Sequence, residues 1–177
     1  LQAKQSAVSV GYDPIVVRNQ EVYRQFLQEA TTEWKTKRQT PLVNAGYAAR
    51  VLAISHAIHS FVAYHQHRQS NRIQLVFLGC GADVIGLWAH SFEPSKVTVL
   101  ELDTPEVCSI KRDLWIRKHF VDPVSSSSNE EDSGRLVGRI RSREHLEAGN
   151  IQPNYALCPI DLRDISQLNN VVQEYMD

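Results

Sequence analysis

A short apolar run that ends in two closely spaced glycines constrains this chain more than any other feature. Ile73 to Leu78 is nearly all apolar, as is typical of a strand covered on both faces in a parallel sheet. Gly79 and Gly81 follow at once, and residues without a Cβ atom let the backbone come close to a ligand. A strand that enters such a turn is typical of α/β folds that bind nucleosides.

A second apolar segment, about twenty residues further on, ends in two carboxylates. Val97 to Leu100 predicts a strand, and Glu101 and Asp103 stand at its carboxyl end. Because they are two residues apart, both side chains point to the same side of an extended segment. A carboxylate here can accept both hydroxyls of a ribose, so we predict a ribose site. The alternative is a solvated acidic turn before a helix N-terminus.

Helical patterns alternate with the strands along the chain. Apolar residues at three- and four-residue spacing predict helices over about 19–37, 42–67, 85–88, 106–120 and 165–175. The helix from about 42 to 67 is expected to bury a stripe that includes Ile54 and Phe61. A third strand is predicted over Tyr155 to Ile160, with Pro159 best placed at its end or at an edge of the sheet. The alternation predicts right-handed crossovers and a parallel sheet with helices on both faces.

The length of 177 residues suits one domain with a sizeable core. We expect a single domain over 1–177, helical to about residue 70 and α/β from about residue 71. The serine-rich, acidic stretch from about 121 to 134 cannot bury enough apolar surface to order itself, so we expect a mobile surface loop there. Few strands are visible, so we expect the α/β fold to be incomplete in this chain.

Composition excludes several classes of protein. The net charge of −1 gives no global electrostatic reason to expect nucleic acid as a partner. The cysteines Cys80, Cys108 and Cys158 are odd in number and lack a CxxC pair, which argues against a disulfide framework and a zinc site. No apolar run is long enough to span a bilayer. We therefore expect a cytoplasmic protein without a membrane partner.

The glycine turn departs from two phosphate-binding patterns. Counting from Gly79, the last glycine position of GxGxxG falls on Val84, which weakens a nicotinamide dinucleotide assignment. No GxxxxGK[ST] loop is present. The histidines between positions 56 and 67 are expected to be helix-surface residues and not metal ligands. No nucleophile elbow or Ser/His/Asp arrangement is present either.

Several motifs together resemble the leucine carboxyl methyltransferases. The motifs are Ala7–Tyr12, Pro41–Val51, Leu78–Asp83, Glu101–Val107 and Asp161–Asp164. Members of this family use S-adenosylmethionine to methylate the C-terminal leucine carboxylate of the protein phosphatase 2A catalytic subunit. The resemblance covers most of the chain from about Lys4, and the Asn-x-Gly-Tyr-x-x-Arg element at Asn44 to Arg50 is its most specific part.

The resemblance implies a Rossmann-like methyltransferase fold with an N-terminal helical lid. It implies that Lys4 and Arg50 hold the methionine carboxylate of S-adenosylmethionine and that Gly79 approaches the cofactor's backbone. Asp103 would stand at the ribose. S-adenosylhomocysteine would be the product. The sequence departs from the family at Ala45, where an arginine is usual.

Asp161 and Leu162 follow the third predicted strand. They repeat the strand-end pattern one strand over, where an adenine base would lie, and the resemblance implies that they flank it. From the residues alone, this segment could equally be a helix cap with Asp164 as the capping residue. The family's next strand and acceptor-side elements would come after Asp177.

A C-terminal carboxylate has a pKa near about 3.5 and is already ionised at neutral pH. Methyl transfer to it needs no general base, so we assign no catalytic acid–base residue. The resemblance implies an enzyme, expected to be a monomer, whose partner is the phosphatase C-terminus. The alternatives are a related tRNA carboxymethyltransferase of the wybutosine pathway, a cofactor-binding fragment without activity, and an NAD-dependent oxidoreductase.

Overall fold

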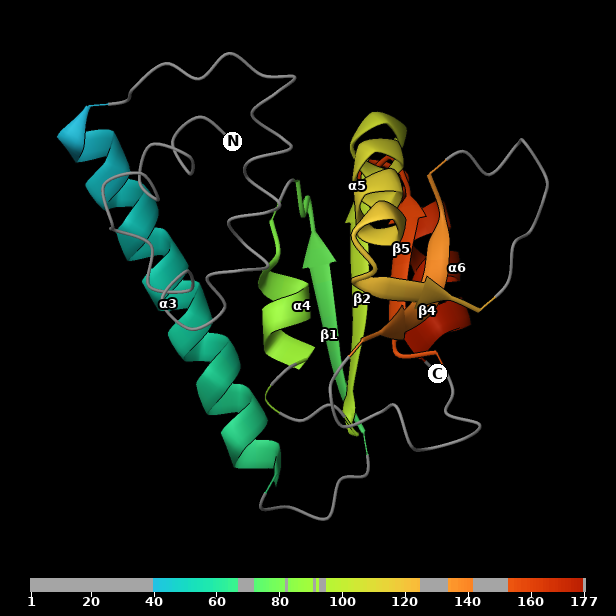
Figure 1. Ribbon diagram of the computed structural model, residues 1–177, viewed down its shortest axis with the longest axis horizontal. Coiled ribbons are helices and arrows are strands. Elements are labelled where there is room, and N and C mark those ends of the chain that lie inside the picture. The colour runs from blue at the N-terminus through green and yellow to red at the C-terminus, as the bar shows by residue number, and fades with distance from the viewer. Residues whose placement is uncertain are drawn as a thin grey trace. The chain divides into compact units, whose positions relative to one another are not determined.

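A computed structural model describes residues 40–66, 72–81, 83–90, 92, 95–124, 134–141 and 153–176 (Figure 1). The chain divides into two compact units, Leu1–His67 and Arg68–Asp177. The helix predicted at about 19–37, the motif at Ala7–Tyr12 and Lys4 lie outside the described residues. No helix in the described ranges has the length and apolar character that crossing a membrane requires.

In the first unit, the helix α3 spans Pro41–Gln66. Thr40 caps its start, since the Thr40 hydroxyl oxygen accepts from the Val43 N–H at 3.4 Å. The predicted apolar stripe is wrong in part, because Ile54 and Phe61 are 37% and 45% exposed. Apolar side chains occur on all sides of this helix, so no single face can bury them all.

The second unit is a five-stranded sheet in the order β1-β2-β5-β4-β3. Its strands are β1 (Ile73–Leu78), β2 (Val97–Asp103), β3 (Val121–Pro123), β4 (Leu136–Ile140) and β5 (Tyr155–Pro159). β1, β2 and β5 run parallel, as predicted, but β4 is antiparallel to β5, and β3 is antiparallel to β4. The prediction of a wholly parallel sheet is therefore wrong for two strands, and the sheet is mixed.

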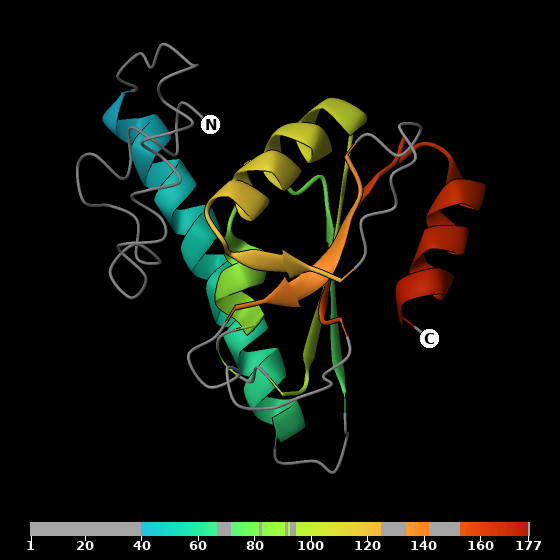
Figure 2. The same ribbon diagram turned by 45° about the vertical axis from the view of Figure 1, so that its right-hand side comes forward.

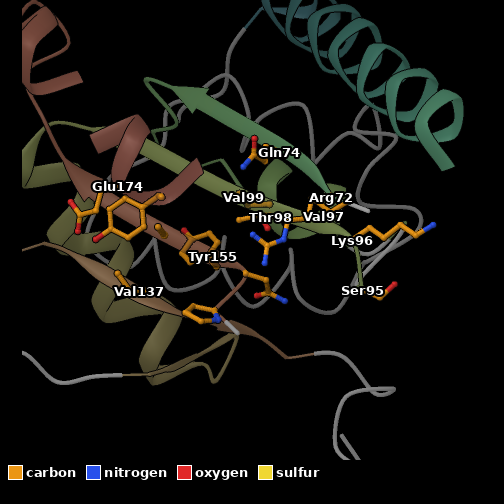
Figure 3. A pocket seen from close by; sticks show the side chains of 14 residues that line it. Arg72, Gln74, Ser95, Lys96, Val97, Thr98, Val99, Val137, Tyr155 and Glu174 are labelled. Atoms are coloured by element: carbon orange, nitrogen blue, oxygen red, sulfur yellow. The ribbon is translucent and has the colours of Figure 1, made fainter. Parts of the chain in front are cut away.

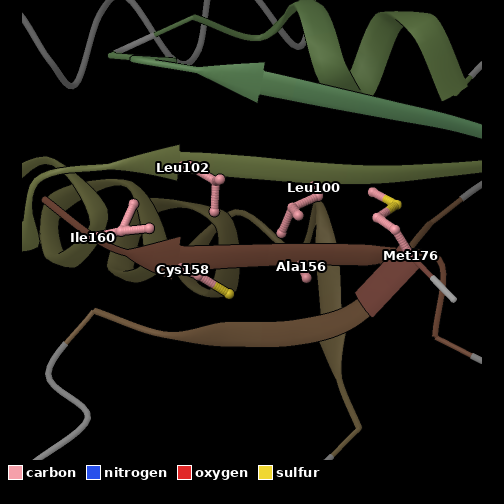
Figure 4. Close-up of a cluster of buried hydrophobic side chains, with 6 residues drawn as sticks. All are labelled: Leu100, Leu102, Ala156, Cys158, Ile160 and Met176. Atoms are coloured by element: carbon pink, nitrogen blue, oxygen red, sulfur yellow. The ribbon is translucent and has the colours of Figure 1, made fainter. Parts of the chain in front are cut away.

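Helices lie on both faces of this sheet, as the alternation of elements predicts. They are α4 (Ile85–His90), α5 (Pro105–Arg117) and α6 (Ile165–Met176). Figure 2 shows α6 on the face opposite to α4 and α5. Under α6 lies a core of apolar side chains from β2, β5 and α6 itself (Figure 4). The predicted strand end at Pro159 is confirmed.

β1 differs from the prediction of a strand covered on both faces. Among the described strands it lies at an edge of the sheet, and Val76 and Leu78 are 41% and 58% exposed. β2 lies between β1 and β5, and, like β5, it is buried along nearly its whole length. An apolar run is therefore a poor guide to which strand is central, because an edge position depends on neighbours from elsewhere in the chain.

The predicted loop from about 121 to 134 is wrong at its start. Val121 is buried and pairs with Ile140, and Asp122 binds Arg141 with an Nη2–Oδ1 distance of 2.6 Å. This antiparallel pairing and ion pair hold Val121–Pro123 in the sheet as β3. The serine-rich part, 125–133, lies outside the described residues.

Gly86 in α4 provides the close helix–strand packing that the missing third glycine would give. A Cβ atom at Gly86 would lie 2.5 Å from Glu101 Oε1 and 2.9 Å from Val99 Cγ1, both in β2. We expect Gly86→Ala to lower the free energy of unfolding by about 1–3 kcal/mol, because neither neighbour can move away in a packed core. Urea denaturation measures this change.

Gly46→Ala in α3 is the matched control, since in the part of the chain that the structure describes no atom lies within 4 Å of the added Cβ. A helix interior favours alanine over glycine by about 0.5–1 kcal/mol, so this variant should not be destabilised. A Gly86→Ala variant as stable as the wild type would contradict the close packing.

Candidate functional site

The turn after β1 depends on its two glycines for its backbone shape. Gly79 and Gly81 have φ angles of 65° and 52°, in the left-handed region that side chains disfavour. A Cβ built at either position would meet no atom of the described residues within 4 Å. The glycines are therefore required by conformation and not by crowding, and open space lies beside the turn.

The N–H groups of the turn bond to the end of β2. Gly79 N–H and Cys80 N–H donate to the Leu102 carbonyl oxygen at 2.8 and 3.4 Å. Gly81 N–H donates to Asp103 Oδ2 at 2.6 Å. Three successive N–H groups therefore have protein partners. A phosphate-binding turn directs such groups at its ligand, and this turn does not.

Asp103 stands at the carboxyl end of β2, beside the open space. Its Oδ1 accepts from the Thr104 N–H at 2.8 Å, in addition to the bond from Gly81. A carboxylate offers about four acceptor positions, so about two remain for a ligand. The side chain is half-buried. Its orientation is fixed by two backbone donors while part of its surface stays accessible, which suits recognition of a diol.

Glu101 occupies a different environment from the one predicted. Its carboxylate is fully buried, with Lys111 Nζ and the Tyr155 hydroxyl 2.7 and 2.5 Å from its Oε2. Trp115 donates its indole N–H to the Tyr155 oxygen at 2.8 Å. Contact with a ribose would require a carboxylate that reaches the surface of the turn. Glu101 therefore supports the turn from below and is not placed to touch a ligand.

These buried partners were missed by sequence reasoning. Burial is the largest single effect and opposes the charge of Lys111, but Glu101 together with Cys80 and Asp83 outweighs it and holds the pKa of the ammonium above its usual value. Burial, and then the neighbouring Glu101 charge, raise the pKa of Tyr155 well above its usual value. Glu101 itself is the sequence feature that could have predicted these partners, because a carboxylate inside an otherwise apolar strand needs a buried cation.

Asp161 follows β5, which lies next to β2. The Ile160 N–H donates to the Asp103 carbonyl oxygen at 2.8 Å, so the two strand ends are joined. Arg163 binds Asp161 with Nη2–Oδ2 and Nε–Oδ1 distances of 2.6 and 2.9 Å, and these contacts lower the pKa of Asp161 to about 2. Leu162 is half-buried against the core under α6.

The alternative role for this segment, a helix cap, is confirmed for Asp164, whereas the position of Asp161 and Leu162 beside an adenine stays a prediction. Asp164 Oδ1 accepts from the Gln167 N–H at 3.0 Å at the start of α6. Asp161 and Asp164 therefore have separate positions, one at the exposed strand end and one at the helix. The strand-end pattern and the cap occur together.

Arg50 lies exposed on α3, in the other unit. Its contact with a methionine carboxylate, like that of Lys4, stays a prediction.

Neither thiol chemistry nor a metal centre is indicated in the described part of the chain. The three cysteines are free and buried. Burial raises the pKa of Cys80 and of Cys108 to about 12, which keeps these thiols protonated and unreactive. Within the same residues, no group of three or more His, Cys, Asp or Glu side chains is arranged to hold a metal ion.

A hollow of about 350 Å³ lies at the other end of the sheet (Figure 3). Arg72, Lys96 and Asn154, which precede β1, β2 and β5, line it together with Gln74 and Glu174. Parallel α/β sheets bind their ligands beyond the carboxyl ends of the strands. The hollow is at the amino ends, so it is not the nucleoside site.

Comparison with known proteins identifies the family. The model of the family "Leucine carboxyl methyltransferase" matches residues 4–174. This chain belongs to the leucine carboxyl methyltransferase family. The suspected family is confirmed, and the mixed sheet with helices on both faces is consistent with the Rossmann-like methyltransferase fold that it implies.

Curated relatives of this family member are longer proteins from yeasts. The chain is 26% identical over 177 residues to "tRNA wybutosine-synthesizing protein 4" of Schizosaccharomyces pombe, a match that covers 98% of this chain and 23% of the relative. The proteins of the same name from Saccharomyces cerevisiae and Candida albicans are 22% and 27% identical over 152 and 136 residues. These matches cover 79% and 67% of this chain, and 20% and 19% of the relatives. The chain therefore spans less than a quarter of their length.

Proposed function

We propose that this chain forms the cofactor-binding part of an S-adenosylmethionine-dependent carboxyl methyltransferase. One observation supports it above the others. The N–H groups of Gly79, Cys80 and Gly81 bond to the end of β2, while Asp103 beside them stays half-buried and open space adjoins both glycines. Such a turn suits a nucleoside without phosphate groups. A dinucleotide would need free N–H donors for its pyrophosphate.

The described residues fit the nucleoside portion of this cofactor. Asp103 would accept the ribose hydroxyls, with its orientation set by Gly81 and Thr104. Asp161 and Leu162, at the next strand end, would flank the adenine. The cofactor supplies an activated methyl group when bound. Arg50, with Lys4, would hold its methionine carboxylate, because a guanidinium makes paired bonds to a carboxylate.

The chemistry asks the protein for orientation and not for proton transfer. A carboxylate acceptor is already ionised at neutral pH, so no side chain has to remove a proton. Holding acceptor and methyl donor in line and away from water can lower the barrier by about 7–11 kcal/mol. We accordingly assign no catalytic acid or base in this chain.

Two acceptors are candidates. The first is the C-terminal leucine carboxylate of a protein phosphatase catalytic subunit, which gives the family its name. The second is a carboxyl group on a modified guanosine of tRNA, and the names of the relatives support it. Both are carboxylates, so the cofactor site described here serves either.

Transfer of a labelled methyl group tests the acceptor. The protein is incubated with labelled S-adenosylmethionine and either a phosphatase C-terminal peptide or tRNA from cells that lack this methylation. Label in the peptide supports the first acceptor, and label in tRNA supports the second. A peptide that ends in an amide is the control, because it lacks the acceptor oxygen. Label in that control would contradict carboxyl methylation.

A further inference from the structure

Four buried polar side chains lie beneath the cofactor turn. We call them the Glu101 cluster: Glu101, Lys111, Trp115 and Tyr155, none more than 2% exposed. Removing two charges from water costs more free energy than a buried ion pair commonly returns. Stability alone therefore does not explain why the pair is present, and its position suggests another role.

The Glu101 cluster lies next to both ends of the turn between β1 and α4. At the start of the turn, Gly79 and Gly81 bond to Leu102 and Asp103, the residues that follow Glu101 in β2. At the other end, α4 begins directly over the Glu101 carboxylate, since a Cβ at Gly86 would be 2.5 Å from Oε1. The last residues of β2 therefore contact both the start of the turn, at Gly79 to Gly81, and the start of α4, at Gly86.

Lys111 fixes this support from the side of α5. Its ammonium lies 2.7 Å from Glu101 Oε2, and its charge also acts on Cys80 and Asp83 in the turn. Tyr155, in β5, donates to the same oxygen. The position of the Glu101 carboxylate is thus set by α5 and β5 together.

We propose that Lys111 is a positioning residue for the cofactor turn, which holds the ionised Glu101 carboxylate in place so that Asp103 and the turn keep their binding shape. The inference rests on the proposed function, because it concerns the same cofactor site. Lys111 itself is buried and does not touch the ligand.

Removal of the lysine charge makes binding depend on pH. The titratable groups near Glu101 are Lys111 from α5, Tyr155 from β5, Asp103 from β2, and Cys80 and Asp83 from the turn, with Cys108 beside Lys111. Among these groups, only Lys111 is a cation. In Lys111→Met, Glu101 can stay buried only when protonated. Ionisation would pull it out of place and disturb the turn.

Calorimetric titration with S-adenosylhomocysteine between about pH 5 and pH 8 tests the proposal. Wild-type affinity should stay nearly constant. Lys111→Met should match it at the acid end and then lose up to about tenfold in affinity per pH unit. The double variant Glu101→Gln/Lys111→Met has no charge to misplace, so its affinity should be within about threefold of wild type at every pH. Lys118→Met, at the C-cap position directly after α5, is the matched control.

The outcomes separate positioning from a purely structural role. Lower thermal stability of Lys111→Met with wild-type affinity at every pH would overturn the proposal. So would a double variant that folds and binds as poorly as Lys111→Met. If Lys111→Met does not fold, the double variant alone decides, and recovery of binding supports the proposal.

A wild-type protein that binds no S-adenosylhomocysteine would overturn the proposed function itself. If the wild type does not bind, thermal unfolding of Lys111→Met still tests the ion pair. The melting temperature of this variant should fall relative to that of the wild type as pH rises. A melting temperature difference that does not vary with pH would then contradict the role of the Lys111 charge.

Discussion

Glu101→Gln should lower the free energy of unfolding by about 3–5 kcal/mol at neutral pH. The substitution keeps the volume of the side chain and removes only its charge. It leaves the Lys111 ammonium fully buried without its counter-charge. Breaking a buried pair from one side costs this much because the remaining ion cannot regain its hydration.

The loss of unfolding free energy in Glu101→Gln should become smaller as pH rises. Without Glu101, burial lowers the pKa of Lys111 in the folded state below the value of about 10.4 in the unfolded chain. The unfolded state then binds more protons than the folded state between these two pKa values. The free energy of unfolding of the variant therefore increases with pH between these two pKa values. Its deficit relative to wild type is largest below the lower of them.

Urea denaturation at neutral pH and near about pH 9.5 measures both effects. Asp113→Asn is the matched control, because Asp113 forms an ion pair with Arg112 on the same helix but is 61% exposed. That surface pair should contribute less than about 1 kcal/mol. A Glu101→Gln loss as small as that of Asp113→Asn, or one that is constant with pH, would contradict the buried ion pair.

Asp103→Asn should weaken binding of S-adenosylhomocysteine about ten- to a hundredfold. A hydrogen bond to a charged group contributes about 1.5–3 kcal/mol, and about 1.4 kcal/mol corresponds to a tenfold change. An amide has only one acceptor oxygen. Its NH₂ would therefore face the N–H of either Gly81 or Thr104, both of which now donate to the carboxylate.

Calorimetry at one pH gives the affinities, and thermal unfolding shows whether the variant is folded. Asp122→Asn is the control, since Asp122 is also a strand carboxylate but lies in β3 and binds Arg141. It should bind S-adenosylhomocysteine as the wild type does. An Asp103→Asn variant with unchanged affinity would remove Asp103 from the ribose site.

Local sequence signals predicted much of the second unit. β1, β2 and β5 lie where the apolar runs place them, and Asp164 caps α6 as its residue type suggests. These features depend on residues a few positions apart, so the sequence holds the information for them. The cap, the strand and the turn are each set by short-range chemistry.

Features that depend on distant residues were harder to predict. The apolar residues of β1 predict a central strand. It lies at an edge of the sheet instead, because no described strand pairs with its outer side. Val121–Pro123 looks like a loop, and its pairing with β4 makes it a strand. Glu101 was predicted to bind a ribose because it points to the same side of β2 as Asp103. Its carboxylate is instead enclosed by side chains from α5 and β5.

The glycine pattern shows the same limit. Val84 at the third glycine position argues against a dinucleotide, and the N–H bonds of the turn support that conclusion independently. Close packing of α4 against β2 still requires a residue without a side chain, however. Gly86, two positions after Val84, is that residue. Fingerprint spacing therefore does not predict at which position the packing requires a glycine.

Calorimetric titration of the wild-type protein with S-adenosylmethionine, S-adenosylhomocysteine and NAD tests the central claim most directly. The claim is that the turn between β1 and α4, with Asp103, binds a nucleoside without phosphate groups. We predict binding of S-adenosylmethionine and S-adenosylhomocysteine and no binding of NAD. Binding of NAD with no binding of the other two would contradict the account.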